Sequence, residues 1–433
     1  MSWNRWYAFK SYMLSALWLA PLIAILFSQI TLWGARALRL DFGGIPGFSF
    51  DDEGIVSAMD VNITATLSFL VFAFGSLLVA IQVSSAQLTP RIIATTLLRD
   101  NVIRWIVGVF VYGLLIAVAV KNRMDTVPRF IVSLAVIWGL VSTVAFLFLI
   151  DYAARLLRPV TIVWRVGQQG LKVIESVFPR PIDKQRVSTH VRQDLGPAER
   201  TVEHRGTSAV VLAVNLEALI AEAQRTDGII EFVPRVGDFV AVGEPLFLLR
   251  GGATRIPDRK LRGQVAFGSE RTIEQDSTFA FRIIVDIAIK ALSKAINDPT
   301  TAVVAIDQLH RLLRAAGKRH LHDDTVFDQT GRLRVIFRTP DWDDFVQLAY
   351  SEIRLYGAEN FQVARRMRAM TENLIQTLPE RRRDALQREL DLLDRALGTL
   401  YAFPEDLALA RIPDSQGLGG ASGAKSPPTS FTA

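Results

Sequence analysis

The residues whose type and spacing could carry chemistry include a set of polar side chains within a long apolar stretch. Ser68, Gly75, Gln82 and Thr89 recur at seven-residue intervals, which keeps them near one face of a helix with a drift of about 20° per heptad. Ser85 lies on the same face, and we call these five residues the polar stripe. Hydroxyl and amide oxygens could line a hydrated ion path or pore. The alternative is packing and hydrogen bonding between helices.

A second group surrounds a predicted helix start. Asn297, Asp298, Pro299, Thr300 and Thr301 are consecutive. Asp298 suits the N-cap position and Pro299 the first helical position, which predicts a capping site. The alternative is a ligand site, where an anion docks on the free backbone N–H groups, although the charge of Asp298 would oppose it.

The remaining candidates for chemistry are sparse. His320 and His322, followed by Asp323 and Asp324, could ligate a metal, whereas a solvated loop is the alternative that we favour. The absence of cysteine excludes disulfides, thiolate metal sites and cysteine nucleophiles. No Gly-x-Ser-x-Gly or His-Glu-x-x-His pattern occurs. We therefore expect no catalytic residues, no enzyme activity, no bound metal and no cofactor.

The polar stripe belongs to one of four stretches without a charged side chain, all within the first 150 residues. A helix needs about 20 apolar residues to cross the hydrocarbon layer. We predict a four-helix transmembrane domain over residues 1–151, with spans at about 11–33, 61–83, 105–120 and 130–150. No acidic residue lies within these spans, which argues against a proton pump built on membrane carboxylates.

Charge on the connecting segments predicts the orientation. Nine Lys and Arg residues flank the spans on the amino-terminal side and five on the other, which favours an inner-membrane protein with both termini cytoplasmic. The formal charge of +6 suits contact with the anionic headgroups of a lipid bilayer. No nucleic-acid-binding motif accompanies this charge, so we expect no nucleic-acid partner.

Behind the spans, the sequence predicts a cytoplasmic α+β domain with a small β-module and C-terminal helices. The predicted order is an amphipathic helix and linker over 152–200, a small β-rich module over 201–263, a mainly helical region with one β-hairpin over 264–402, and a disordered tail over 413–433.

Several strings resemble those of one family. They are residues 79–91, Gln275-Asp276, Asp286-Ile287-Ala288, Ala291-Leu292-Ser293, residues 297–302 and residues 350–354. The chain resembles a bacterial family of predicted membrane proteins, domain of unknown function 2254, from Trp3 to about Tyr401. Similar proteins often have proline or glycine where this chain has Lys294-Ala295, which leaves the turn before Asn297 open. The resemblance implies an inner-membrane protein with a cytoplasmic domain, and it supplies no activity or site residues.

Two functions follow from these features. The first is a channel or transport-related protein regulated by its cytoplasmic domain. Four helices make a thin wall, so a pore would require a homo-oligomer. The alternative is a membrane-anchored sensor or assembly platform without transport or catalysis. Either could take a small ligand or ion, whose identity the sequence does not indicate.

Overall fold

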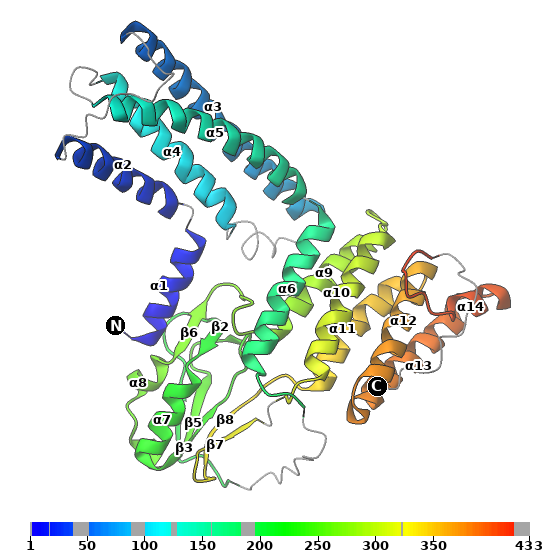
Figure 1. The fold of residues 1–433 in the computed structure, drawn as a ribbon. Coiled ribbons are helices and arrows are strands. Elements are labelled where there is room, and N and C mark those ends of the chain that lie inside the picture. The colour runs from blue at the N-terminus through cyan, green and yellow to red at the C-terminus, as the bar shows by residue number, and fades with distance from the viewer. Residues whose placement is uncertain are drawn as a thin grey trace, which may run out of the picture. The chain divides into compact units, whose positions relative to one another are not determined.

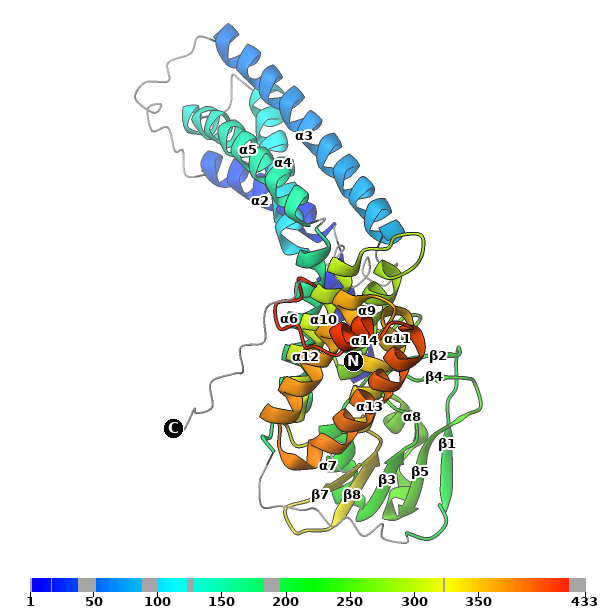
Figure 2. The same cartoon turned by 90° about the vertical axis from the view of Figure 1, so that its right-hand side faces the viewer.

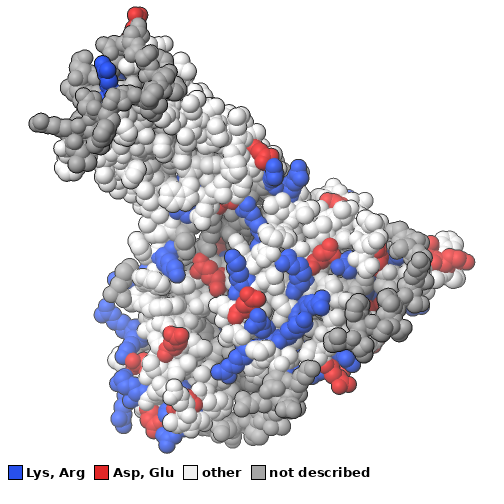
Figure 3. Space-filling view, in the orientation of Figure 1, with Lys and Arg blue, Asp and Glu red and all other residues white. Residues whose placement is uncertain are grey.

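The computed structural model describes residues 2–16, 18–37, 52–87, 100–122, 128–156, 158–182, 195–321 and 324–419. The chain divides into two compact units. The apolar unit comprises residues 9–86 and 90–162, and the polar unit comprises residues 1–8, 87–89 and 163–433. Figure 3 shows Lys, Arg, Asp and Glu spread over the polar unit, whereas the visible face of the apolar unit is mostly uncharged.

Five helices account for most of the first 156 residues (Figure 1). They are α1 (Trp3–Ser15), α2 (Leu19–Ala37), α3 (Asp52–Gln87), α4 (Asn101–Asn122) and α5 (Arg129–Leu156). Among the described residues, three helices are long and apolar enough to cross a membrane, in α3, α4 and α5. Their mean hydropathies are 1.8, 2.3 and 2.4, in that order, and α4 is the most buried of the three, which makes it the centre of the bundle.

Small and polar residues allow the helices of the apolar unit to approach closely. A Cβ on Gly113 of α4 would lie 2.5 Å from the Trp138 side chain of α5, so glycine is required there. The Trp138 indole donates to the Val109 carbonyl at 2.9 Å. Asn62 of α3 donates to the Ala135 carbonyl of α5 at 3.1 Å. Such contacts replace the hydrophobic effect as the cause of association within lipid.

The predicted first span, residues 11–33, is not one helix. The structure divides it between α1 and α2, with non-helical residues around Ala16 and Trp18. Pro21 explains the break, because in a continuous helix it would lack an N–H for the carbonyl four residues earlier and its ring would clash there. In the first turn of α2 the missing N–H costs nothing. The other three predicted spans lie within α3, α4 and α5.

The polar unit begins its own fold with α6 (Pro159–Val177), most of which belongs to this unit, and then forms two sheets. The first sheet has the order β1-β5-β3-β8-β7 (Figure 2), and the second has the order β4-β2-β6. The strands are β1 (Arg200–Glu203), β2 (Ala209–Val214), β3 (Gly228–Phe232), β4 (Phe239–Val240), β5 (Pro245–Gly251), β6 (Val265–Gly268), β7 (Thr325–Phe327) and β8 (Leu333–Phe337). Helices α7 (Leu216–Thr226) and α8 (Asp258–Arg262) and the 3-10 turn η3 (Gly252–Arg255) lie between strands in sequence.

The hairpin predicted within the helical region is part of the β-module. Strand β8 pairs in parallel with β3, with Ile230 opposite Val335. Both residues are fully buried in one core, together with Phe247 and Leu249 of β5. The module therefore uses two segments that are about a hundred residues apart, whereas we expected a continuous module over 201–263.

The helical part of the polar unit is built around α9 (Ser277–Ala291), whose inward face is fully buried. Phe281, Ile283 and Ile284 have no exposed surface. Arg282 forms ion pairs with Asp286 on the same helix and with Glu352 of α11. The helices are α9 (Ser277–Ala291), α10 (Pro299–Gly317), α11 (Trp342–Gly357), α12 (Phe361–Thr377), α13 (Arg383–Leu400) and α14 (Pro404–Ala410), with η4 (Glu380–Arg382) before α13.

The predicted disordered tail, 413–433, is ordered at its start. Arg365 of α12 is fully buried and donates to the carbonyls of Ile412 and Gly419, each at 2.9 Å. Asp414 accepts from the backbone N–H groups of Gly417 and Gly419 at 2.9 and 2.7 Å. A buried guanidinium needs acceptors, and the chain after α14 supplies them. Residues 420–433 of the predicted tail lie outside the described residues.

Candidate ligand pocket of the polar unit

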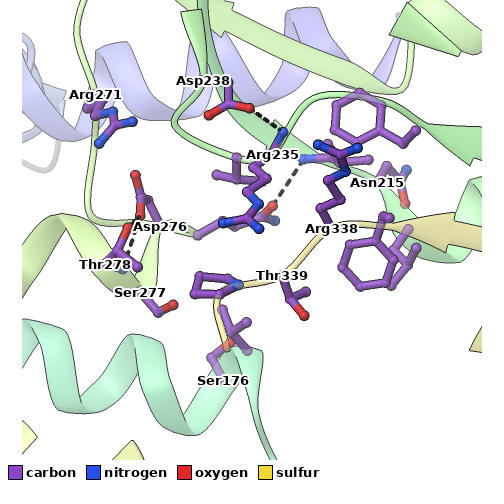
Figure 4. A pocket seen from close by; sticks show the side chains of 18 of the residues that line it. Ser176, Asn215, Arg235, Asp238, Arg271, Asp276, Ser277, Thr278, Arg338 and Thr339 are labelled. Atoms are coloured by element: carbon purple, nitrogen blue, oxygen red, sulfur yellow. Dashed lines mark hydrogen bonds between the residues drawn. The ribbon is translucent and has the colours of Figure 1, made fainter. Parts of the chain in front are cut away.

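A pocket of about 780 Å³ lies within the polar unit (Figure 4). Small-molecule sites typically occupy roughly 300–1,000 Å³. The lining comes from six segments, namely the start of α1, the end of α6, the β2–α7 junction, the turn after β3, the segment entering α9, and the β8–α11 connection with the first turns of α11. Both sheets and the helical region therefore contribute.

Two of these segments connect directly to the apolar unit along the chain. Trp3 begins α1, after which the chain continues into α2. Ser176, Val177 and Pro179 end α6, which follows α5. The pocket wall thus includes one segment that precedes the apolar helices in sequence and one that follows them.

The amino-terminal segment is tied to the rest of the polar unit. The backbone N–H of Asn4 donates to the Gly263 carbonyl at 3.2 Å. The Tyr7 hydroxyl donates to the Glu274 carboxylate. The rings of Trp3 and Tyr7 stack with centroids 5.3 Å apart. These three contacts, from Asn4, Tyr7 and Trp3, hold the start of α1 in place, and Trp3 lines the pocket there.

Asp276 caps the helix that enters the pocket floor. One carboxylate oxygen, Oδ1, accepts from the backbone N–H groups of Thr278 and Phe279, each at 3.1 Å, and from the Thr278 hydroxyl at 2.6 Å. The other oxygen, Oδ2, is buried and has no hydrogen-bond partner among the described residues. Burial raises the pKa of Asp276, against the lowering effect of the Thr278 hydrogen bond and of the Arg271 charge.

Gly237 provides the space that this carboxylate occupies. It lies in the Val236-Gly237-Asp238 turn with φ +96°, a conformation that favours glycine. A Cβ at this position would lie 2.3 Å from Oδ2 of Asp276. The Gly237 carbonyl accepts from Nε of Arg271 at 2.6 Å. The turn therefore orients both the arginine and the acid on this side of the pocket.

Three arginines line the pocket, and they differ in how far they are neutralised. Arg235 forms an ion pair with Asp344 at 3.0 Å, and Asp238 accepts from its backbone N–H at 2.8 Å. Arg338 is exposed and has no hydrogen-bond or ion-pair partner within the described ranges. Figure 4 shows the guanidinium groups of Arg271 and Arg338 on opposite sides of the view, with the Arg235 side chain between them.

A second helix start contributes to the wall. Asn215 caps α7 by accepting from the Ala218 N–H at 3.2 Å. Gln275 accepts from the Val214 N–H at 3.0 Å, which connects the β2–α7 junction to the segment before α9. Since a helix start carries partial positive charge, α7 and α9 both favour negative charge in the pocket. Glu217, exposed in the first turn of α7, opposes this effect.

The apolar part of the wall includes three aromatic residues beside its aliphatic ones. Phe232 at the end of β3 is almost fully buried, and Phe337 at the end of β8 and Trp3 are half-buried. An apolar wall with a few polar groups is typical of small-molecule sites. Arginine, amide and hydroxyl donors beside aromatic rings can bind and orient a ligand.

The polar stripe lies on α3, in the apolar unit. Ser68 is exposed, and its hydroxyl donates to a carbonyl of its own helix at 2.9 Å. Gly75 has open space where a Cβ would be, and Gln82 is exposed. The side chain of Ser85 and all of Thr89 lie outside the described residues. The hydrated ion path predicted for the polar stripe, and the alternative of packing between helices, both stay predictions.

The predicted capping group lies at the start of α10. Asp298 accepts from the Thr301 N–H at 3.0 Å and from the Thr301 hydroxyl at 2.5 Å. Asn297 adopts a left-handed conformation with φ +48°, and Thr300 is exposed. Asp298 is thus the N-cap of α10. A ligand role for this group stays a prediction.

The weak metal candidates are only partly described. The His320 backbone N–H donates to the Arg180 carbonyl at 2.9 Å. His322 lies outside the described residues. Within the ranges that the structure describes, no cluster of three or more His, Asp and Glu residues has metal-binding geometry.

Sequence reasoning missed the pocket. It identified Gln275-Asp276 only as part of a family resemblance. The arginines stand more than thirty positions apart along the chain, so no local motif unites them. A usable signal was that each arginine borders a turn or a strand end, where binding residues concentrate.

Comparisons with known proteins agree with the apolar helices. The sequence matches the family described as "Predicted membrane protein (DUF2254)" over residues 11–373. It is 25% identical to uncharacterised proteins of Mycobacterium tuberculosis (strain H37Rv) and Mycobacterium bovis, over 94% of this chain and 81% of each relative. No solved structure matches. Because the family match covers most of the sequence, the chain belongs to the DUF2254 family of predicted membrane proteins.

Proposed function

We propose that this membrane protein is an inner-membrane sensor of a small molecule. The ligand binds in the pocket of the polar unit, and its binding alters the segments that lead into and out of the membrane helices. The observation that carries the proposal is the presence of Trp3 and of Ser176, Val177 and Pro179 in one pocket wall. We assign no catalytic step to this protein.

The anchor in this proposal has four spans, with α2 as the first. Residues 1–8 pack within the polar unit, as the contact of Tyr7 with Glu274 illustrates. The segment before α2 and the polar unit after α5 must then lie on one side of the membrane, which requires an even number of crossings. Three long apolar helices need a fourth, and α2, with 19 residues, extends about 28 Å. The excess of Lys and Arg on that side supports a cytoplasmic location.

Hydrogen exchange on the full chain in lipid nanodiscs tests the proposal. The small-molecule fraction of a bacterial lysate serves as the source of ligand. We expect slower exchange in pocket peptides and altered exchange in peptides from α1 and α6, because both helices contribute to the wall. Leu348→Trp, which fills the pocket from α11, should abolish both effects.

Leu355→Trp is the matched control. It places the same side chain on the same helix, at a residue that is 70% exposed and does not line the pocket. Protection in the pocket without any change in α1 or α6 would contradict sensing. Protection that survives Leu348→Trp would place the ligand elsewhere.

Ion conduction is a second candidate, favoured by one observation on α3. The face that carries Ser68, Gly75 and Gln82 is exposed in the single chain. In a homo-oligomer this face would line a path with amide and hydroxyl groups. Such a channel would use the pocket of the polar unit as its regulatory site, so the two proposals share one ligand-binding region.

A further inference from the structure

We infer that the ligand of this pocket is a small organic anion, with a phosphate or carboxylate group bound by Arg338 and Arg271 and an apolar body against the aromatic wall. This inference rests on the proposed function, because it names the chemical class of the molecule sensed.

The acids of the lining are mostly engaged. Asp344 accepts from the Arg235 guanidinium and from the Asp341 N–H at the start of α11. Asp238 accepts from the Arg235 backbone, and Oδ1 of Asp276 caps α9. Each of these carboxylates already has donors in the protein. A cationic ligand would find few uncommitted acceptors there.

Two acidic groups of the lining, Glu217 and Oδ2 of Asp276, differ from these engaged carboxylates. Glu217 is exposed at the pocket edge and has no ion pair within the described residues. Oδ2 of Asp276 lacks a hydrogen-bond partner, but it is enclosed against Gly237, and burial raises the pKa of this carboxyl. The exposed carboxylate of Glu217 is therefore the acid of the lining best placed to attract a cation.

The basic groups are less committed. Arg338 has no partner within the described ranges. Arg271 donates a hydrogen bond only from Nε, to the Gly237 carbonyl, although its charge also acts on the Asp276 carboxyl. Its two terminal nitrogens remain available for a bidentate contact with a carboxylate or phosphate. The starts of α7 and α9 add partial positive charge. Positive groups thus exceed the free negative ones.

The apolar wall determines the rest of the ligand. The half-buried rings of Phe337 and Trp3 offer surface that an inorganic ion would leave uncovered. The volume of about 780 Å³ is also far larger than a single phosphate needs. An anionic head joined to an aromatic or aliphatic body satisfies both the arginines and the rings.

Four probes that share a ring test the inference by calorimetry on the full chain in nanodiscs, with empty nanodiscs as the blank. They are phenyl phosphate, benzoate, benzyl alcohol and benzylamine. We expect the two anions to bind and the neutral and cationic probes to bind at least about tenfold more weakly. The stronger of the two anions identifies the head group.

Variants link the binding to the arginines. Arg338→Gln and Arg271→Gln should each weaken the binding of phenyl phosphate by about tenfold, the typical effect of one charge-assisted hydrogen bond. Arg395→Gln removes an exposed arginine of α13 outside the pocket, and it should leave the affinity unchanged.

Three results would overturn the inference. They are tighter binding of benzylamine than of both anions, no binding of either anion, and equal affinity in wild type and the two pocket variants. Preferred binding of benzylamine, abolished by Leu348→Trp, would leave the sensor proposal intact and reject only the anion. Failure of the sensor proposal is read separately, from the exchange of α1 and α6.

Discussion

The Tyr7 hydroxyl donates a hydrogen bond to the Glu274 carboxylate, which joins the amino-terminal helix to the segment before α9. The two residues are 267 positions apart, with all the apolar helices between them in sequence. Since both belong to the polar unit, they must lie on the same side of a membrane. This contact constrains the number of crossings more directly than hydropathy does.

Cysteine labelling tests the resulting topology, and the natural chain has no cysteine that would interfere. The proposal of four crossings with both termini cytoplasmic predicts Ser2 and Ser415 on the cytoplasmic side and Asn122, at the end of α4, on the other. We expect a membrane-impermeant maleimide to label Asn122→Cys in intact cells. Ser2→Cys and Ser415→Cys should be labelled only after permeabilisation.

The position of α2 decides the result at Ser2. If α2 does not cross, Ser2→Cys reacts in intact cells together with Asn122→Cys, and the four-span proposal is wrong. Detergent-solubilised samples of all three variants should label fully, which controls for the intrinsic accessibility of each thiol.

Gly237→Ala should destabilise the polar unit through Asp276. The new Cβ would approach Oδ2 of Asp276 at 2.3 Å, in addition to the strain of a positive φ. Gly243→Ala is the matched control, because Gly243 has φ +89° and no atom near the Cβ position. We expect Gly237→Ala to cost on the order of 1–3 kcal/mol more than Gly243→Ala, measured by thermal melting.

The same substitution in a second background isolates the cause. Asp276→Ser keeps an N-cap hydroxyl for α9 and removes the carboxylate. The additional cost of Gly237→Ala should largely disappear in Asp276→Ser. An unchanged cost in that background would show that backbone strain alone is responsible.

The pH dependence of stability should have opposite signs at two aspartates. Burial raises the pKa of Asp276, so its ionisation penalises the folded state. Relative to Asp276→Asn, the wild type should be most stable below about pH 4 and lose stability as the pH rises through the raised pKa.

Hydrogen bonds from Thr330 and Arg334 lower the pKa of Asp328. Relative to Asp328→Asn, the wild type should lose stability as the pH falls below about 4.

Melting curves between acidic and neutral pH check both signs on the full chain. The difference between wild type and variant is compared at each pH, which cancels the titration of all other groups. Parallel curves for wild type and Asp276→Asn would mean that the carboxyl at 276 titrates alike in the folded and unfolded chain.

Local patterns in the sequence predicted some parts of the structure well. Three of the four apolar stretches are long helices. In the hydrocarbon layer a charge-free run of this length has few other ways to pair its backbone N–H and C=O groups. The break before α2 was also readable, since Pro21 cannot lie inside a helix at no cost. We overlooked it because absence of charge, rather than helix continuity, set the predicted span.

Long-range pairing was not predictable from local patterns. The parallel register of Ile230 with Val335 joins segments that each look like an isolated hairpin strand. The pocket depends on this pairing, because β3 and β8 carry Phe232 and Phe337 into its wall. Arg271 and Arg338 line one pocket only through the tertiary fold, and no spacing rule connects them.

Ion flux provides the test of the conduction candidate. Gln82→Leu removes the amide from the exposed face of α3 and should reduce flux through liposomes that contain the oriented protein. Gln82→Asn retains an amide and should preserve more of the flux. Flux no greater than in empty liposomes, with protein inserted and oligomeric, would eliminate conduction.

The chain after α14 should stabilise α12 through Arg365. Removing residues 412–433 takes away the carbonyls of Ile412 and Gly419 that accept from this buried guanidinium. A buried charge that loses hydrogen-bond acceptors costs on the order of 3 kcal/mol, which should lower the melting temperature by several degrees. A chain that ends after residue 420 keeps these acceptors and should melt like the wild type.

Arg365→Met separates the charge from the packing of the same segment. Methionine has a similar length and needs no acceptor, so the truncation should cost much less in this background. Equal cost in both backgrounds would mean that residues 412–419 stabilise α12 by contact alone. In that case Asp414, which organises the turn through the Gly417 and Gly419 N–H groups, becomes the residue to substitute next.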